Sequence, residues 1–194
     1  QTEKGGQLVS DNTAAKTTVG ALLDEVNAAF ADSFTLPDGF LTDTYNHLAA
    51  ALALREPTAD GEMTVTAKDG KLTTGLVPAQ YRRVFFGDAE CLRGSTTLCA
   101  LLPDFPICAP GDDGSAAVTL DGDYTIHYRK LPDAVTAESA ASAPVSLRDL
   151  PYLHAALSAA VCRHIGDADA AAACEADAAR ALAARAAAGG RIPG

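Results

Sequence analysis

The chain has 194 residues and a formal net charge of −10 at pH 7, from 25 acidic and 15 basic side chains. This length fits one domain, or one domain with an appendage, and excludes two large domains. The basic residues are scattered, with Tyr81-Arg82-Arg83 as the densest group, so the composition argues against a direct grip on nucleic acid.

The five cysteines form no Cys-x-x-Cys pair, and their odd number argues against a complete set of disulfides. We therefore expect reduced thiols in a cytosolic setting. The apolar runs all fall short of the roughly 18 residues that a membrane span needs. The first residues lack the basic-then-apolar order of a signal peptide, so we expect a soluble protein.

The N-terminal third predicts an arm followed by two helices. Residues 1–16 are polar and aperiodic, as in an arm that becomes ordered on contact with a neighbour. From there, apolar residues recur at helical spacing, which predicts a helix capped by Thr17 or Thr18 and ended before Pro37. A second helix is predicted within residues 38–56, and the short linker favours an antiparallel pair.

The middle of the chain changes to a period of two, which predicts a small antiparallel β domain over residues 59–130. Its clearest signal is Asp69-Gly70, which suits a type I′ hairpin turn between two alternating stretches. Further strands are predicted at 81–86, 97–102, 116–120 and 124–128.

The last third predicts a helix that ends at Gly166 and an alanine-rich final helix over residues 167–188. The predicted fold is therefore α+β, with a helical bundle from 17–58 and 131–188, the β domain inserted at 59–130 and a tail at 189–194. The predicted core joins the first two helices to the third through Val19, Leu22, Leu23, Val26, Phe30, Leu41, Tyr45, Leu48, Leu52, Leu153, Leu157 and Val161.

Patterns for catalysis or metal binding are weak. Cys162, His164 and Cys174, or His154 with His164, would be metal candidates, but their spacing does not fit one coordination sphere. No local signature supports a nucleophilic cysteine paired with a histidine at position 47, 127, 154 or 164. The common phosphate, dinucleotide, zincin and hydrolase motifs are absent from the sequence. We expect no catalytic residue, metal or cofactor.

Four aspartates crowd the predicted turns at strand ends: Asp112, Asp113, Asp121 and Asp123. They lack the ligand spacing of an EF-hand loop, which favours a pair of solvated turns over a calcium site.

Three stretches, taken in order, resemble the head-to-tail adaptor (connector, or neck) proteins of tailed bacteriophages. Residues 18–27 (TVGALLDEVN) and 40–49 (FLTDTYNHLA) are similar to the family's opening helix pair, with its pattern of aspartate, two to four residues, leucine or tyrosine, and asparagine. Residues 124–132 (YTIHYRKLP) resemble its strand-then-proline pattern I-x-Y-x-x-x-P. Residues 145–157 (VSLRDLPYLHAAL), then Gly166-Asp167 and the alanine-rich segment, are similar to its closing helices.

The resemblance spans about residues 17–188, although 91–110 match no part of the pattern. It implies a non-enzymatic virion protein, made in the host cytoplasm and located in the neck. There it forms a homo-oligomeric ring, commonly twelve-fold, below the portal protein. The ring continues the DNA channel toward a downstream tail or neck protein, and the genome passes through without specific binding.

The implied function assigns roles to two groups of residues. An acidic channel would repel sliding DNA, so Asp112, Asp113, Asp121 and Asp123 are the channel-facing candidates, with outward solvated loops as the alternative. The family's C-terminal region commonly reaches the portal, so residues 181–194 are the expected contact, with passive chain ends as the alternative. Its charged anchors would be Arg180, Arg185 and Arg191.

Other functions remain open at this point. A tail-completion or terminator ring would need a dominant β-sheet with few helices. A small cytosolic enzyme would use an acid or a thiol in the β domain. A DNA-packaging protein is disfavoured by the negative charge.

Overall fold

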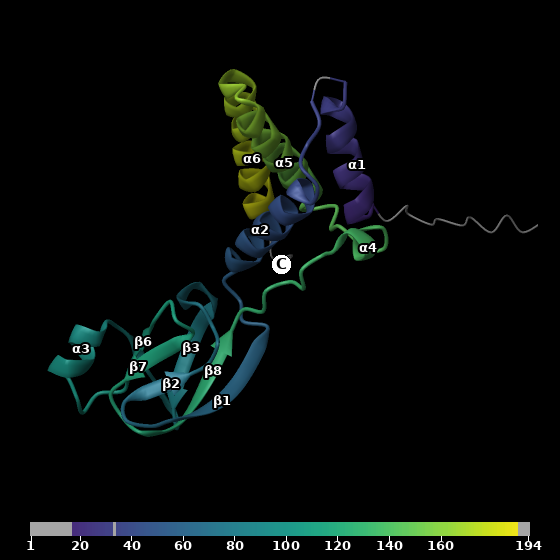
Figure 1. Ribbon diagram of the computed structural model, residues 1–194. Helices are drawn as coiled ribbons and strands as arrows, with labels where there is room; N and C mark the ends of the chain where they lie inside the picture. The colour runs from purple at the N-terminus through teal and green to yellow at the C-terminus, as the bar shows by residue number, and fades with distance from the viewer. Residues whose placement is uncertain (1–16, 33, 190–194) are drawn as a thin grey trace, which may run out of the picture. The chain divides into compact units, whose positions relative to one another are not determined.

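The computed structural model describes residues 17–32 and 34–189, and its fold is α+β, as predicted (Figure 1). The chain divides into two compact units. We call residues 1–48 and 134–194 the helical unit and residues 49–133 the β unit. In the described residues, no helix is both long enough and apolar enough to span a bilayer.

Helix α1 (Val19–Phe30) begins where the sequence predicts a cap. The Thr18 hydroxyl accepts a hydrogen bond from the Ala21 N–H at 3.2 Å, which satisfies one of the free donors of the first turn. Just before the helix, the Val145 N–H donates to the Thr17 carbonyl at 2.9 Å. The start of α1 is therefore tied to a segment far along the chain.

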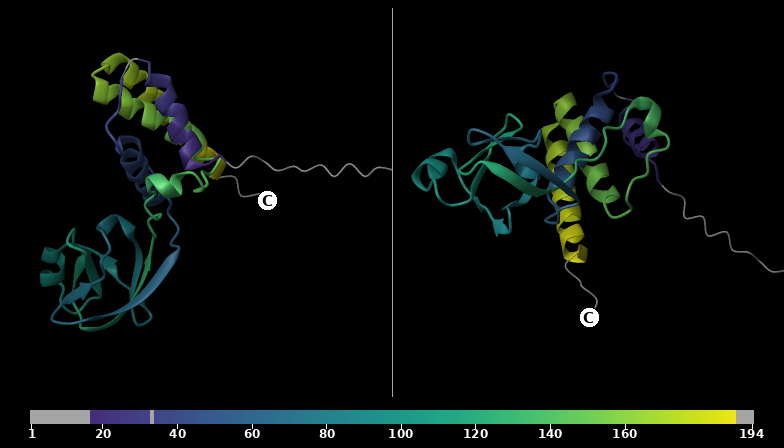
Figure 2. Two further views of the ribbon diagram at one scale, coloured as in Figure 1. Left: turned by 45° about the vertical axis from the view of Figure 1, so that its right-hand side comes forward. Right: turned by 90° about the horizontal axis from the view of Figure 1, so that it is seen from below.

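The other helices of the chain's two ends are α2 (Phe40–Leu54), α4 (Ala137–Ala140), α5 (Leu150–Ile165) and α6 (Ala168–Gly189). Helices α5 and α6 pack along each other, as both views in Figure 2 show. Between them Gly166 adopts a left-handed φ of 81°, and the Asp167 N–H donates to the Cys162 carbonyl at 2.9 Å. This is the glycine cap that the sequence predicts.

Helix α1 packs mainly against α4 and α5. Its contact with α2, the predicted antiparallel partner, is less extensive. Gly20 of α1 allows the approach to α4, because a Cβ there would lie 3.2 Å from the Ala140 carbonyl oxygen. Of the twelve predicted core residues, Phe30, Leu41 and Leu48 are only half-buried. The others are buried: Val19, Leu22, Leu23, Val26, Tyr45, Leu52, Leu153, Leu157 and Val161.

The β unit contains two four-stranded sheets. One has the order β1-β8-β3-β4 and is antiparallel, with β1 (Gly61–Ala67), β8 (Gly122–Tyr128), β3 (Tyr81–Phe86) and β4 (Ala89–Glu90). The other has the order β2-β7-β6-β5, with β2 (Lys71–Thr73), β7 (Ser115–Val118), β6 (Ile107–Pro110) and β5 (Leu92–Arg93). Strands β5 and β6 are parallel, which departs from the antiparallel prediction.

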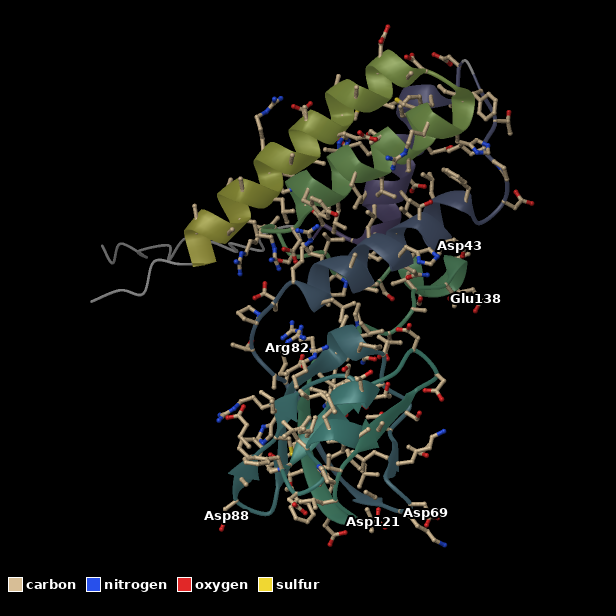
Figure 3. All side chains as sticks on the ribbon, turned by 90° about the vertical axis from the view of Figure 1, so that its left-hand side faces the viewer. Asp43, Asp69, Arg82, Asp88, Asp121 and Glu138 are labelled. Atoms are coloured by element: carbon tan, nitrogen blue, oxygen red, sulfur yellow. The ribbon has the colours of Figure 1, made fainter. Side chains whose placement is uncertain are left out.

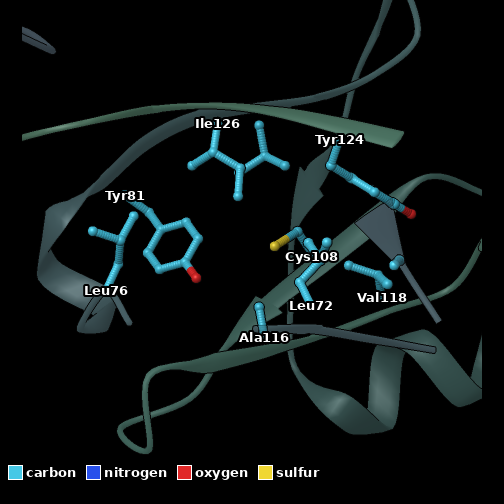
Figure 4. Close-up of a cluster of buried hydrophobic side chains, with 10 residues drawn as sticks. Leu72, Leu76, Tyr81, Cys108, Ala116, Val118, Tyr124 and Ile126 are labelled. Atoms are coloured by element: carbon cyan, nitrogen blue, oxygen red, sulfur yellow. The ribbon is translucent and has the colours of Figure 1, made fainter. Parts of the chain in front are cut away.

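Both sheets contribute to one core, part of which Figure 4 shows. Tyr124 and Ile126 of β8 and Leu72 of β2 are fully buried in it. The tyrosine hydroxyls in this core have partners: Tyr124 donates to the Leu120 carbonyl at 2.9 Å, and the Tyr81 hydroxyl lies 2.6 Å from that of Thr74. Burial of these rings therefore leaves no unsatisfied hydroxyl.

The predicted hairpin turn is present, but its strands separate. Asp69 and Gly70 have φ values of 54° and 71°, and Lys68 and Lys71 exchange two backbone hydrogen bonds of 3.1 Å. This is the geometry that a two-residue turn with two positive φ angles requires. Beyond the turn β1 and β2 belong to different sheets.

The strand predicted at 97–102 is wrong. These residues lie mostly in a short helix, α3 (Thr96–Leu101), whose first turn is capped by the Ser95 hydroxyl, which accepts from the Leu98 N–H at 3.3 Å. A three-residue 3-10 helix, η1 (Pro78–Gln80), precedes β3. Strand β6 follows Pro106 and ends at Pro110, and it was not among the predicted strands.

Candidate interaction surfaces

Two of the predicted channel aspartates follow β7, Asp121 in the loop before β8 and Asp123 within β8, and both stabilise local structure. The Asp121 carboxylate accepts hydrogen bonds from the Asp69 N–H at 3.2 Å and the Gly70 N–H at 2.8 Å, so it fixes the β1–β2 turn. Asp123 accepts from the Thr66 hydroxyl at 2.6 Å. Figure 3 shows Asp69 and Asp121 at the same end of the β unit.

The other two lie in the turn that precedes β7. Asp113 Oδ1 accepts from the Ser115 N–H at 3.0 Å and from its hydroxyl at 2.7 Å, and the Lys71 ammonium lies 3.6 Å from Asp113 Oδ2. These hydrogen bonds, more than the lysine, lower the pKa of Asp113. Asp112 is exposed, and no contact of its side chain is found among the described residues.

The structure therefore separates the four aspartates into two pairs, one at each end of strand β7. Residues 17–32 and 34–189 contain no cluster of three or more histidine, cysteine, aspartate or glutamate side chains that could hold a metal ion. Asp113, Asp121 and Asp123 accept hydrogen bonds from nearby residues. Asp112 is exposed and makes no side-chain contact within the described residues.

The predicted portal-contact arginines differ in how they are engaged. Arg185 is mostly buried and donates through Nε to Asp149 Oδ1 at 2.6 Å, while its own carbonyl accepts from Arg148 at 3.0 Å. It therefore joins the end of α6 to the start of α5. Arg180 is exposed and pairs with Asp177 on the same helix. Arg191 lies outside the described residues.

The thiols show no sign of activation. Burial raises the pKa of Cys108 to about 12 and that of Cys91 to about 11, so both are protonated at neutral pH. All five cysteines are free. A nucleophilic cysteine would need the opposite shift, toward a lower pKa.

Three of the four histidines make contacts with residues other than cysteine. His127 lies 3.6 Å from Glu62, and its ring packs against Phe85. His154 lies 3.6 Å from Glu25. The ring of His164 packs 4.7 Å from that of Phe40, measured between centroids.

Exposed apolar side chains lie on and near helix α3 in the β unit. They belong to the segment that does not match the adaptor pattern, and together we call them the α3 surface: Leu92, Leu101, Leu102 and Phe105. Leu101 is 70% exposed and Phe105 62% exposed. Grouped exposure of large apolar side chains is typical of a protein-binding surface. The sequence alone does not indicate this surface, because the composition of residues 97–102 favours a strand.

A groove of about 650 Å³ lies in the helical unit, between α1, the loop before α2, the first turn of α2, and α4. We call it the α1–α2 groove. The half-buried side chains of Leu36, Phe40 and Leu41 and the buried Leu23 line its apolar part. No sequence motif indicated it, since the groove depends on how α4 meets α1.

Neither the family models nor the curated proteins compared with this chain match it.

Proposed function

We propose that this chain is a head-to-tail adaptor of a tailed bacteriophage or a related particle: a structural virion protein in the neck, without enzymatic activity. It forms a homo-oligomeric ring, by resemblance twelve-fold, that docks below the portal protein. The ring continues the DNA channel to a downstream tail or neck protein. The genome passes through it without specific binding.

One observation carries the proposal: the three stretches that resemble the adaptor pattern fall on elements of the kind the pattern requires, in its order. The first covers most of α1 and the first part of α2, and the second covers most of β8. The third covers the first half of α5, after which Gly166 leads into α6. The asparagine of the first stretch, Asn46, has a defined role, since its amide binds the backbone of Val135. The proposal therefore rests on agreement between sequence pattern and element type.

The charge of the chain supports a conduit. The whole chain has a net charge of −10, and the β unit carries exposed carboxylates at Asp112, Asp113, Asp121 and Asp123, which would repel a phosphate backbone. Repulsion lets DNA slide, whereas clustered basic side chains would hold it by counterion release.

The exposed surfaces support an assembled state. The α3 surface leaves Leu101 and Phe105 in water, which a protein contact would relieve. On α6, Arg180 is exposed and is a suitable charged contact for the portal, although it must exchange its partner Asp177. Arg191 belongs to the tail that is expected to reach the portal.

The proposal is tested by mixing the purified chain with its isolated portal and measuring mass by size-exclusion chromatography with light scattering. We expect a closed ring, either of the chain alone or of the chain on the portal. A mixture that stays a monomer or dimer with unbound portal would contradict the proposal and would favour the small-enzyme alternative.

A matched pair of variants separates assembly from folding. Phe105→Ser removes an exposed side chain of the α3 surface, and Leu147→Ser removes an equally exposed side chain of the helical unit. If the α3 surface binds a neighbour in the particle, Phe105→Ser weakens assembly while Leu147→Ser leaves it unchanged. Equal effects would remove the α3 surface from the assembly.

A further inference from the structure

The α1–α2 groove combines an apolar interior with a rim of negative charge. Its charged lining residues are Asp24 of α1 and Asp38 in the loop before α2, and both are exposed. Among the lining residues that the structure describes, none is a lysine or an arginine. Asp43 and Glu138, which Figure 3 labels on α2 and α4, follow the lining residues Thr42 and Ala137 directly. The lining therefore suits a segment that carries apolar side chains and a positive charge.

The two rim carboxylates have no partner of their own. Within the part of the chain that the structure describes, neither Asp24 nor Asp38 makes a hydrogen bond or ion pair through its side chain. The apolar lining is likewise incompletely covered, because Leu36, Phe40 and Leu41 are only half-buried. Both features are those of a surface that a further segment would complete.

The chain itself has a segment joined to this groove. Thr18 is one of the lining residues, and residues 1–16 are connected to it through Thr17. Sixteen residues, QTEKGGQLVSDNTAAK, come before Thr17. They contain one pair of large apolar residues, Leu8-Val9, and the cations Lys4 and Lys16, together with the acidic Glu3 and Asp11, so the charge contact proposed below is assigned to Lys4 alone.

The tether is long enough for this segment to turn back. The eight residues from 10 to 17 can span up to about 26 Å when extended. The groove's edge along α1, from Thr18 to Asn27, is about 14 Å long at the rise of a helix. Between the apolar pair and α1, Ser10-Asp11-Asn12-Thr13 is rich in residues that favour a reversal of the chain.

We propose that the N-terminal arm, residues 1–16, binds in the α1–α2 groove of its own chain. Leu8 and Val9 cover the apolar lining, and Lys4 lies near the carboxylates of Asp24 and Asp38. A covalent tether of this length gives a local concentration in the millimolar range, so a weak contact is enough to fill the site. This inference concerns the isolated chain and does not depend on the proposed virion function.

The first test compares the full chain with a chain that starts at Thr17, by methyl NMR of the leucine and valine side chains. Removal of the arm shifts the resonances of Leu36 and Leu41 and leaves those of Leu72 in the β unit unchanged. A synthetic peptide of residues 1–16, titrated into the shortened chain, restores the shifts in a saturable way. Unchanged Leu36 and Leu41 resonances on truncation would overturn the proposal.

Variants then test the chemistry of the contact. In the peptide, Leu8→Ser with Val9→Ser abolishes saturable binding, and Lys4→Glu weakens it about twofold to fivefold, as expected for an exposed ion pair. Gln7→Ser is the matched control and leaves binding unchanged. Binding that ignores the Leu8 and Val9 changes would overturn the assignment of these side chains to the groove.

A dilution series distinguishes binding of the arm to its own chain from binding to a second copy. For the proposed contact, the Leu36 and Leu41 resonances of the full chain keep the same positions over a hundredfold range of concentration. Positions that move toward those of the shortened chain on dilution would show exchange of arms between copies and overturn the proposal. Deletion of residues 190–194 is the second control, because a shift of these resonances would assign the groove to the C-terminal tail instead.

Discussion

Asn46 of α2 pairs with the backbone of Val135 in both directions. Asn46 Nδ2 donates to the Val135 carbonyl at 2.9 Å, and the Val135 N–H donates to Asn46 Oδ1 at 2.8 Å. The two residues are 89 positions apart in the sequence. The side-chain amide thus imitates a strand partner and fixes the second segment of the helical unit where it begins.

Replacing Asn46 by alanine leaves the Val135 N–H and carbonyl without this partner. We expect the free energy of unfolding in urea to fall by about 1 to 3 kcal/mol. Asn46→Asp is also destabilising, because it loses the donor and places a carboxylate against the Val135 carbonyl. The exposed neighbour His47 provides the control, and His47→Ala should change stability by less than about 0.5 kcal/mol. Equal stability of the Asn46→Ala and His47→Ala chains would contradict this role.

The buried thiol of Cys108 predicts a loss of stability at alkaline pH. Its pKa is raised to about 12 by burial, whereas the thiol of an unfolded chain has a pKa near 9. Between these values the unfolded state has released its proton and the folded state retains it, so the free energy of unfolding falls as pH rises. Well below pH 9 the contribution is constant, because the thiol is protonated in both states.

Cys108→Ala removes this contribution. Urea unfolding measured from pH 7 to pH 11 should show a shallower alkaline decline for the variant, after its difference from the natural chain at pH 7 is subtracted. Burial also raises the pKa of Cys91 to about 11 and that of Tyr124 to about 12. These two groups therefore cause part of the alkaline loss of stability in both chains. Parallel curves for the two chains would refute the burial of a protonated Cys108.

Charge reversal at two aspartates separates a channel role from a folding role. Asp112→Lys changes an exposed charge that makes no described contact, so we expect unchanged stability and, if the loop faces the channel, impaired retention or ejection of DNA. Asp121→Lys should destabilise the β unit by about 0.5 to 1.5 kcal/mol, because it removes the acceptor for the exposed Asp69 and Gly70 amides. Normal DNA release by particles that carry Asp112→Lys would place this loop outside the channel.

Arg180 and Arg185 allow a similar comparison for portal binding. Arg185→Ala breaks the half-buried pair with Asp149, so thermal unfolding should occur at a lower temperature. Arg180→Ala removes an exposed pair and should leave the unfolding temperature nearly unchanged. Weaker portal binding by the Arg180→Ala chain would therefore report a direct contact, whereas unaltered binding would exclude Arg180 as an anchor.

The helices and turns were largely predictable because their signals are local. The cap at Thr18, the left-handed Gly166 and the Asp69-Gly70 turn each depend on side chains within a few residues of one another. The separation of β1 and β2 into different sheets was not predictable, since it depends on their partners β8 and β7, more than forty residues away.

Residues 91–110 show why the candidate surfaces were harder to predict. Thr96 to Leu101 contain β-branched and apolar residues that favour a strand, but the Ser95 cap and the surrounding fold make them a helix. The α3 surface follows from that helix. In the same way, nothing in the spacing of Asp112, Asp113, Asp121 and Asp123 indicates that they flank one short strand or that Asp121 binds the hairpin turn.

The most direct test of the adaptor function is to image purified particles from the same source at a resolution that allows side chains to be traced. We predict a ring of this chain between the portal and the tail, with the genome channel along its axis. Particles whose neck contains no density for this chain, while the chain is present in infected cells, would contradict the function proposed for it.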